Sequence, residues 1–155
     1  MKNLKPGLCS LSAIFLFALL NAQEPVIPVR EPDYSKPLLF HQLPQKIECR
    51  THELLSLLQA TKGQEIDLDL ALNFKFRGTV TSVANKYNGA LQSVVIRSVN
   101  YDGAVLSFSK TTDEYGVIKY SGRILSFNHG DALEITEEEG RYFFIKKSLY
   151  DIINE

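Results

Sequence analysis

The chain has 155 residues, of which 45% are hydrophobic and 23% are charged, and its formal net charge is -1 at pH 7. This near-neutral balance argues against nucleic acid as a partner, because contact with phosphates requires a clustered basic surface. It also argues against electrostatic docking on an anionic membrane. The composition is typical of a globular protein with one hydrophobic core.

The first 22 residues have the pattern of a cleavable export signal. Lys2 and Lys5 precede an apolar run over residues 8–20, and Ala22 offers a small residue at the end of the segment. The run is too short to span a bilayer, which takes about 20 apolar residues. We therefore expect residues 1–22 to be removed and the mature protein to be periplasmic or secreted, without insertion into the membrane.

Only one of the two cysteines would remain in the mature protein, because Cys9 lies within the signal and Cys49 does not. A single thiol cannot form an internal disulfide bond. Cys49 is therefore expected either to be buried or to make an intermolecular disulfide, and burial is the commoner state for such a cysteine.

Residues 23–45 are expected to form an extended leader, because the prolines of the mature part all lie there. Leu38, Leu39 and Phe40 are too apolar for a free spacer, so we expect this part of the leader to dock on the folded domain. If the leader contacts a partner instead, these three residues are the candidate binding residues. The remaining residues, 46–155, are expected to form a single domain.

Residues 51–62 predict a helix near the start of this domain. Thr51 can cap its first turn, and Glu53 suits the positive end of the helix dipole. One face of the helix is apolar and is formed by Leu54, Leu55, Leu57 and Leu58. That face should pack against the rest of the domain.

Apolar residues occupy every second position from Ile66 to Val80, which predicts a strand with one face in water. A two-residue hairpin would reverse this alternation, because it pairs positions three apart. The alternation continues past Asn73. We therefore expect one long strand, or two segments joined by a bend, and we place the bend near Gly78.

The remainder of the chain predicts short strands separated by turns of Gly, Asn and Asp. The expected strands are 91–98, 104–110, 117–127, 132–136 and 141–147. A capping box from Ser148 to Asp151 predicts a short helix that continues through Ile153. The predicted fold class is α+β, a strongly bent antiparallel β-meander of about six strands, open or partly closed into a barrel, with one N-terminal and one C-terminal helix.

His129 and Asp131 are the best candidates for acid–base catalysis, because a carboxylate can orient an imidazole and only Gly130 separates the two. The same residues are typical of a turn, and that structural role is the favoured interpretation. No metal site and no cofactor are expected, because the histidines, His41, His52 and His129, show no ligand spacing.

Two functions are compatible with these features. The first is a small exported protein without catalytic activity, such as an inhibitor or an accessory subunit, that binds a protein or an extracellular polymer. Its contact would be made by the leader or by a sheet edge, which can add a strand from a partner. The alternative is a small exported hydrolase that uses His129 and Asp131.

Overall fold

The structure is a computed structural model that describes residue 33 and residues 35–153. The export signal predicted at residues 1–22 and the leader residues 23–32 lie outside the described residues. Within the described part of the chain, no helix is long and apolar enough to cross a membrane.

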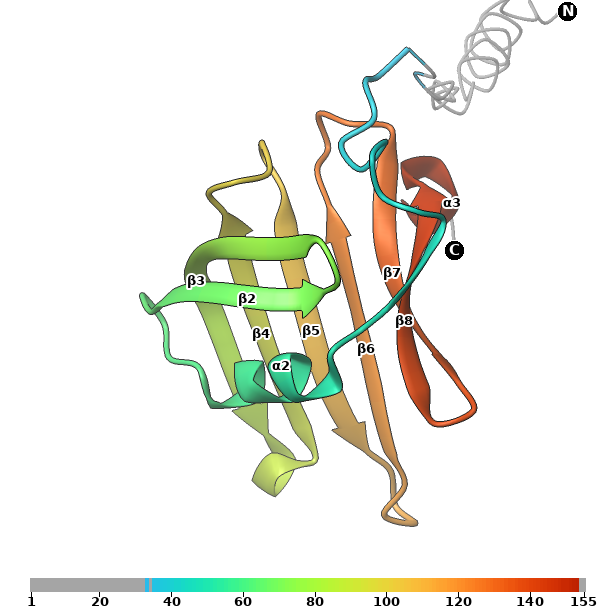
Figure 1. The fold of residues 1–155 in the computed structure, drawn as a ribbon. Coiled ribbons are helices and arrows are strands. Elements are labelled where there is room, and N and C mark those ends of the chain that lie inside the picture. Colours follow the sequence, from blue (N-terminus) through green and yellow to red (C-terminus); the bar gives the residue numbers. More distant parts are fainter. Residues whose placement is uncertain (1–32, 34, 154–155) are drawn as a thin grey trace, which may run out of the picture. The chain divides into compact units, whose positions relative to one another are not determined.

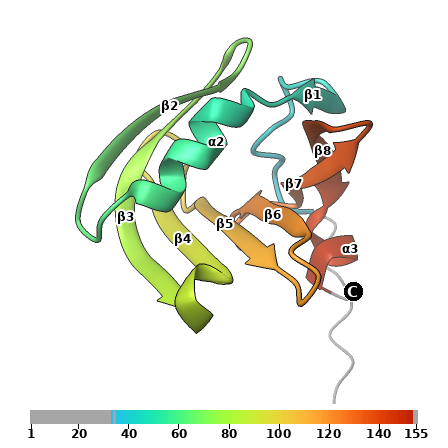
Figure 2. The ribbon, with the colours of Figure 1, turned by 90° about the horizontal axis from the view of Figure 1, so that it is seen from below.

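Eight strands form one antiparallel sheet across the described residues, in the order β1-β8-β7-β6-β5-β4-β3-β2 (Figure 1). The strands are β1 (Lys46–Glu48), β2 (Glu65–Ala71), β3 (Phe74–Lys86), β4 (Leu91–Ser98), β5 (Val105–Thr112), β6 (Ile118–Leu125), β7 (Asp131–Glu138) and β8 (Arg141–Ser148). The other elements are the helices α2 (Thr51–Ser56) and α3 (Leu149–Ile153) and the 3₁₀ turns η1 (Leu57–Gln59) and η2 (Tyr87–Gly89). The sheet curls into a half-barrel, with α2 across its concave side (Figure 2). The predicted antiparallel meander with two short helices is therefore confirmed, with eight strands instead of about six.

The alternating stretch from Ile66 to Val80 forms two strands, β2 and β3, joined by a tight hairpin, so the prediction of one long strand is wrong. Ala71 pairs with Phe74 across a two-residue turn, in which Asn73 has a φ of 61°. The alternation survives this turn because a β-bulge between Asp69 and Ala71 inserts an extra residue. The bulge reverses the alternation once and the turn reverses it again, so the two effects cancel.

The curl of the sheet is produced along β3, where the sequence predicts a bend. A second bulge lies between Val80 and Ser82, and such bulges bend and twist a strand. Just before it, β4 approaches so closely that a Cβ atom on Gly78 would lie 2.3 Å from the carbonyl oxygen of Arg97. Only glycine permits this approach, which explains its position in an otherwise apolar series.

The hydrophobic core lies on the concave side of the sheet. Its largest fully buried side chains include those of Phe40, from the segment before β1, and of Phe74, Phe76, Phe108 and Phe144, from the strands. Leu54 and Leu57 are added by α2 and η1. The ring of Phe74 contacts both Phe40 and Phe144 edge to face, with centroids 6.4 and 5.5 Å away. Side chains therefore fill the inside of the half-barrel, and α2 covers them.

The two helices differ from their predictions in their ends. α2 stops at Ser56 and continues only as η1, and its N-cap position is Arg50, without a side-chain capping bond, in place of the predicted Thr51. Glu53 lies in the first turn, as predicted. At the C-terminal helix the hydroxyl of Ser148 accepts a hydrogen bond from the Tyr150 amide at 3.2 Å, so the serine half of the predicted capping box is confirmed.

The chain that leaves β1 connects the two ends of the sheet. The amide of Cys49 donates to the carbonyl of Tyr142 on β8, and the amide of Arg50 donates to the carbonyl of Leu70 on β2, both at 2.8 Å. Arg50 also forms an ion pair with Asp69 on β2. Cys49 itself is buried, which confirms the favoured alternative for this thiol.

Candidate functional site

The predicted leader residues and the predicted catalytic carboxylate lie together in the structure. The carboxylate of Asp131, at the start of β7, accepts hydrogen bonds from the backbone amides of Leu39 at 2.6 Å and Phe40 at 2.9 Å. The Phe40 side chain is 1% exposed, whereas Leu38 is 52% exposed. The expected docking of this segment on the domain is thus confirmed for Phe40, which lies in the core and is not accessible to a partner.

Residues 35–45, which we call the strap, are fixed along their length. The amide of Gly130 donates to the carbonyl of Pro37 at 3.0 Å, and the amide of Lys146 donates to the carbonyl of Gln45 at 2.9 Å. The ammonium of Lys36 donates to the carbonyl of Phe127 at 2.8 Å. Because its ends are bonded to the β6–β7 turn and to β8, and its middle is bonded to Asp131 of β7, the strap is part of the folded domain.

His129 belongs to the turn before β7 and does not contact the Asp131 carboxylate through a hydrogen bond in the described residues. Its Nδ1 lies 3.0 Å from the hydroxyl of Ser126, and the same hydroxyl accepts a hydrogen bond from the Asn128 amide at 3.3 Å. Ser126 is only 1% exposed. Ser126 belongs to no catalytic motif in the sequence, although its place three residues before a histidine in a turn is a recognisable signal.

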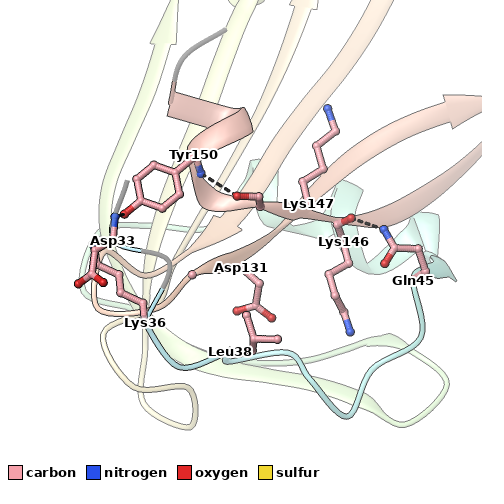
Figure 3. A pocket seen from close by; sticks show the side chains of 10 residues that line it. Asp33, Lys36, Leu38, Gln45, Asp131, Lys146, Lys147 and Tyr150 are labelled. Atoms are coloured by element: carbon pink, nitrogen blue, oxygen red, sulfur yellow. Dashed lines mark hydrogen bonds between the residues drawn. The ribbon is translucent and has the colours of Figure 1, made fainter. Parts of the chain in front are cut away.

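A pocket of about 360 Å³ lies beside the strap, between it, β8 and α3 (Figure 3). The Tyr150 hydroxyl accepts a hydrogen bond from the Asp33 amide, and the Gln45 side chain donates to the carbonyl of Lys146. Hydrogen bonds from Asp33 and from the strap to the C-terminal part of the chain therefore fix the groups at the edge of the pocket. It is lined on one side by the Leu38 and Asp131 side chains, so the two predicted sets of site residues meet here.

Lysines outnumber carboxylates in the lining of this pocket. The lysines are Lys36, Lys146 and Lys147, and the carboxylates are Asp33 and Asp131. Both carboxylates are held by hydrogen bonds: Asp131 by the two strap amides, and Asp33 by the Ser35 hydroxyl and amide, which lower the pKa of Asp33.

The ammonium groups have different partners. Lys36 and Lys146 each donate to a main-chain carbonyl, that of Phe127 and that of Leu43. Lys147 forms an ion pair with Glu134 at 2.6 Å. A carbonyl takes up one donor of a lysine but does not neutralise its charge. Lys36 and Lys146 therefore keep their positive charges in a lining that also contains the carboxylates of Asp33 and Asp131.

The residues considered for metal binding or nucleophilic chemistry are placed apart. In residues 33 and 35–153, no group of three or more His, Cys, Asp and Glu side chains is arranged to hold a metal ion. His41 contacts the carbonyl of Leu38 at 3.2 Å, and His52 lies 3.6 Å from Glu53 on the surface of α2. Burial raises the pKa of the Cys49 thiol to about 12, so this thiol is a poor nucleophile at neutral pH.

Comparison of the chain with family models, with curated proteins and with solved structures finds no match. Its function is therefore inferred from the fold and from the chemistry of its own residues.

Proposed function

We propose that the protein is a small exported binding protein without catalytic activity, and that the pocket beside the strap receives an acidic group of its partner. The observation that supports this proposal is that two ammonium groups of the lining, those of Lys36 and Lys146, form no ion pair among the described residues. Lys36 and Lys146 are held there by carbonyls, while both lining carboxylates already accept hydrogen bonds. A fixed pocket with two ammonium groups that form no ion pair suits the carboxylate of a protein side chain or chain end.

The geometry around Asp131 favours binding over hydrolysis. A general base needs an oxygen or nitrogen that can reach the proton it removes. Both carboxylate oxygens of Asp131 accept strap amides, and the side chain is 3% exposed. The hydrolase alternative retains one favourable contact, that between Ser126 and His129, but this serine is enclosed by the turn and does not face the pocket lining.

Binding in the pocket can be tested by NMR titration of the ¹⁵N-labelled chain from residue 23 with two matched probes, acetyl-Glu-Glu-amide and acetyl-Gln-Gln-amide. We expect saturable shifts in the amides of residues 36, 130 and 146–150 with the acidic dipeptide only. Shifts of equal size with both dipeptides, or shifts centred elsewhere, would contradict the proposal.

Matched variants separate charge from structure. In the double variant Lys36→Gln, Lys146→Gln, the side chains stay polar and can donate hydrogen bonds, but the positive charges are lost. We expect the shifts caused by the acidic dipeptide to disappear. Lys62→Gln, in the exposed turn after η1, removes one charge at a distance and should leave them unchanged.

A further inference from the structure

β6 is paired along its whole length on one side and along less than half of its length on the other. All eight residues of β6 pair with β5, whereas only residues 123–125 pair with β7. Beyond these three positions the two strands diverge (Figure 1). The β7-facing edge of β6 over residues 118–122 is therefore left without a neighbouring strand in the described part of the chain.

Side chains keep the two strands apart. A Cβ atom on Gly122 would lie 2.9 Å from Cδ1 of Ile135, so the Ile135 side chain fills the space over that glycine. Farther along, the ring of Tyr120 packs edge to face against Tyr142 of β8, with centroids 5.7 Å apart. Because these contacts belong to the packed inner side of the sheet, the divergence is a fixed feature of the fold.

The unpaired edge exposes backbone hydrogen-bonding groups at every second residue. The amide of Asp113 donates to the carbonyl of Val117 at 3.0 Å where the β5–β6 hairpin begins. In an antiparallel ladder the bonded positions alternate, so every second residue of β6 counted from Val117 bonds to β5. The intervening residues, Ile118, Tyr120 and Gly122, turn their N–H and C=O groups away from β5, where an added strand would bond to them.

The inner side of this edge is apolar. Ile118 is 46% exposed. Next to it lies a small depression that is too narrow to hold a water molecule, so a partner side chain would cover it and would not enter it. It is lined by Thr51, Leu54, Leu55, Phe108, Tyr120 and Tyr142. Alternate side chains of an added strand would point toward this side. A bulky apolar side chain there would cover Ile118 and the mouth of the depression.

The outer side of the same edge is basic. Lys119 and Arg123 are exposed, lie on the opposite face from Ile118 and Tyr120, and form no ion pair among the described residues. Lys119 lies within the unpaired edge, whereas Arg123 lies one residue beyond it, where its backbone pairs with Glu134 of β7. Acidic side chains on the outer face of an added strand would compensate these charges.

We propose that this edge of β6 accepts an extended segment of another protein, in which apolar residues alternate with acidic ones. Main-chain hydrogen bonds to Ile118, Tyr120 and Gly122 hold the segment. The apolar residues face the depression, and the acidic residues lie beside Lys119 and diagonally across from Arg123. This site is separate from the pocket beside the strap, because the pocket is lined by the start of β7 and by β8 but by no residue of β6.

The probe for this site is a designed heptapeptide, acetyl-Ser-Glu-Ile-Glu-Phe-Glu-Ser-amide, titrated into the ¹⁵N-labelled chain from residue 23. We expect saturable amide shifts in residues 118–123 and in α2. Two matched peptides serve as controls: one with N-methyl groups on alternate amides, which cannot pair as a strand, and one with Lys in place of Glu. Both should bind at least about tenfold more weakly.

Charge reversal in the protein tests the outer face. Lys119→Glu with Arg123→Glu should weaken binding of the acidic peptide by about tenfold or more and strengthen binding of the lysine peptide, because the charges become complementary again. The control is Lys86→Glu. Lys86 lies on the same outer face, in the same row of cross-strand neighbours as Lys119, but at the far end of that row, on β3. This substitution should leave both affinities unchanged.

Three outcomes would overturn the proposal: equal affinity for the N-methylated peptide, shifts confined to residues away from β6, or no response to the charge reversal. Sedimentation provides a further test. If the free chain forms a dimer and the Lys119→Glu, Arg123→Glu variant is a monomer, this edge binds a second copy of the chain. That result would exclude a segment of another protein as its occupant. Loss of dipeptide binding in the pocket beside the strap would leave the β6 result unchanged, so the two proposals fail independently.

Discussion

The carboxylate of Asp131 lies 2.6 Å from the amide nitrogen of Leu39, so the first residue of β7 holds a segment 92 residues earlier in the chain. A buried carboxylate needs such donors, because its desolvation is costly when they are absent. The residue that the sequence suggested as a catalytic group thus has a structural contact that accounts for its burial.

Replacement of Asp131 by Asn should destabilise the domain by about 1–3 kcal/mol. The amide side chain has one acceptor oxygen, and its NH₂ group would oppose the second strap amide. Urea unfolding followed by circular dichroism gives the free energy of unfolding. Asp102→Asn, in an exposed turn, is the control and should stay within about 0.5 kcal/mol of the parent chain. Equal stability of the two variants would show that the strap bonds contribute little.

Phe40→Ala should cost about 3–5 kcal/mol, because it removes a fully buried ring and leaves a cavity against Phe74 and Tyr101. Leu38→Ala, two residues earlier on the strap, removes an apolar side chain that is 52% exposed and should cost much less. Chemical unfolding of both variants tests whether the strap carries part of the core. A small effect of Phe40→Ala would place its ring outside the core in solution.

The stability of the chain should depend on the ionisation of Cys49 at high pH. Burial raises the pKa of its thiol from 9.0 to about 12 in the folded state. Below pH 9 the thiol is protonated in both states. Between pH 9 and 12 it ionises only in the unfolded state, so the parent chain should lose stability relative to Cys49→Ala by about 1.4 kcal/mol per pH unit.

The comparison with Cys49→Ala removes the contributions of tyrosines and lysines, which titrate in the same pH range in both proteins. A pH-independent difference between the two proteins would show that the thiol is hydrated in the folded state.

Expression of the full chain in a host with an export pathway should yield a mature protein that begins near Gln23. Intact-mass measurement of the purified protein gives the site of cleavage directly. Replacement of two apolar residues of segment 8–20 by Asp should retain the uncleaved chain inside the cell. Recovery of the full-length mass outside the cytoplasm would contradict cleavage at this position.

The sequence predicted the sheet well where turns are marked by glycine or asparagine. All five connections from η2 to the β7–β8 turn contain glycine or asparagine, and in four of them such a residue has a positive φ, as at Asn88 and Gly140. The β2–β3 hairpin was missed, although Asn73 marks its turn, because the bulge at Asp69–Ala71 restored the alternation that a hairpin normally reverses. Periodicity alone cannot distinguish a continuous strand from a hairpin with such a compensation.

The candidate site was less predictable for a different reason. Closeness in sequence suggested a pair between His129 and Asp131, whereas the structure pairs each with another group, Ser126 and the strap amides. Contacts between residues 91 or 92 positions apart leave no periodic signal in a single sequence. The apolar character of Leu38, Leu39 and Phe40 indicated that the leader docks, but it gave no information about where.

The pairing of β1 with β8 also constrains when the protein can fold. The first strand of the domain has to wait for the last one, and Phe40 cannot find its full set of neighbours until Phe144 has been synthesised. Contacts of such long sequence separation slow folding. In a chain that emerges gradually, β1 and Phe40 would therefore stay undocked until β8 has been synthesised, so the domain can close only when translation is nearly complete.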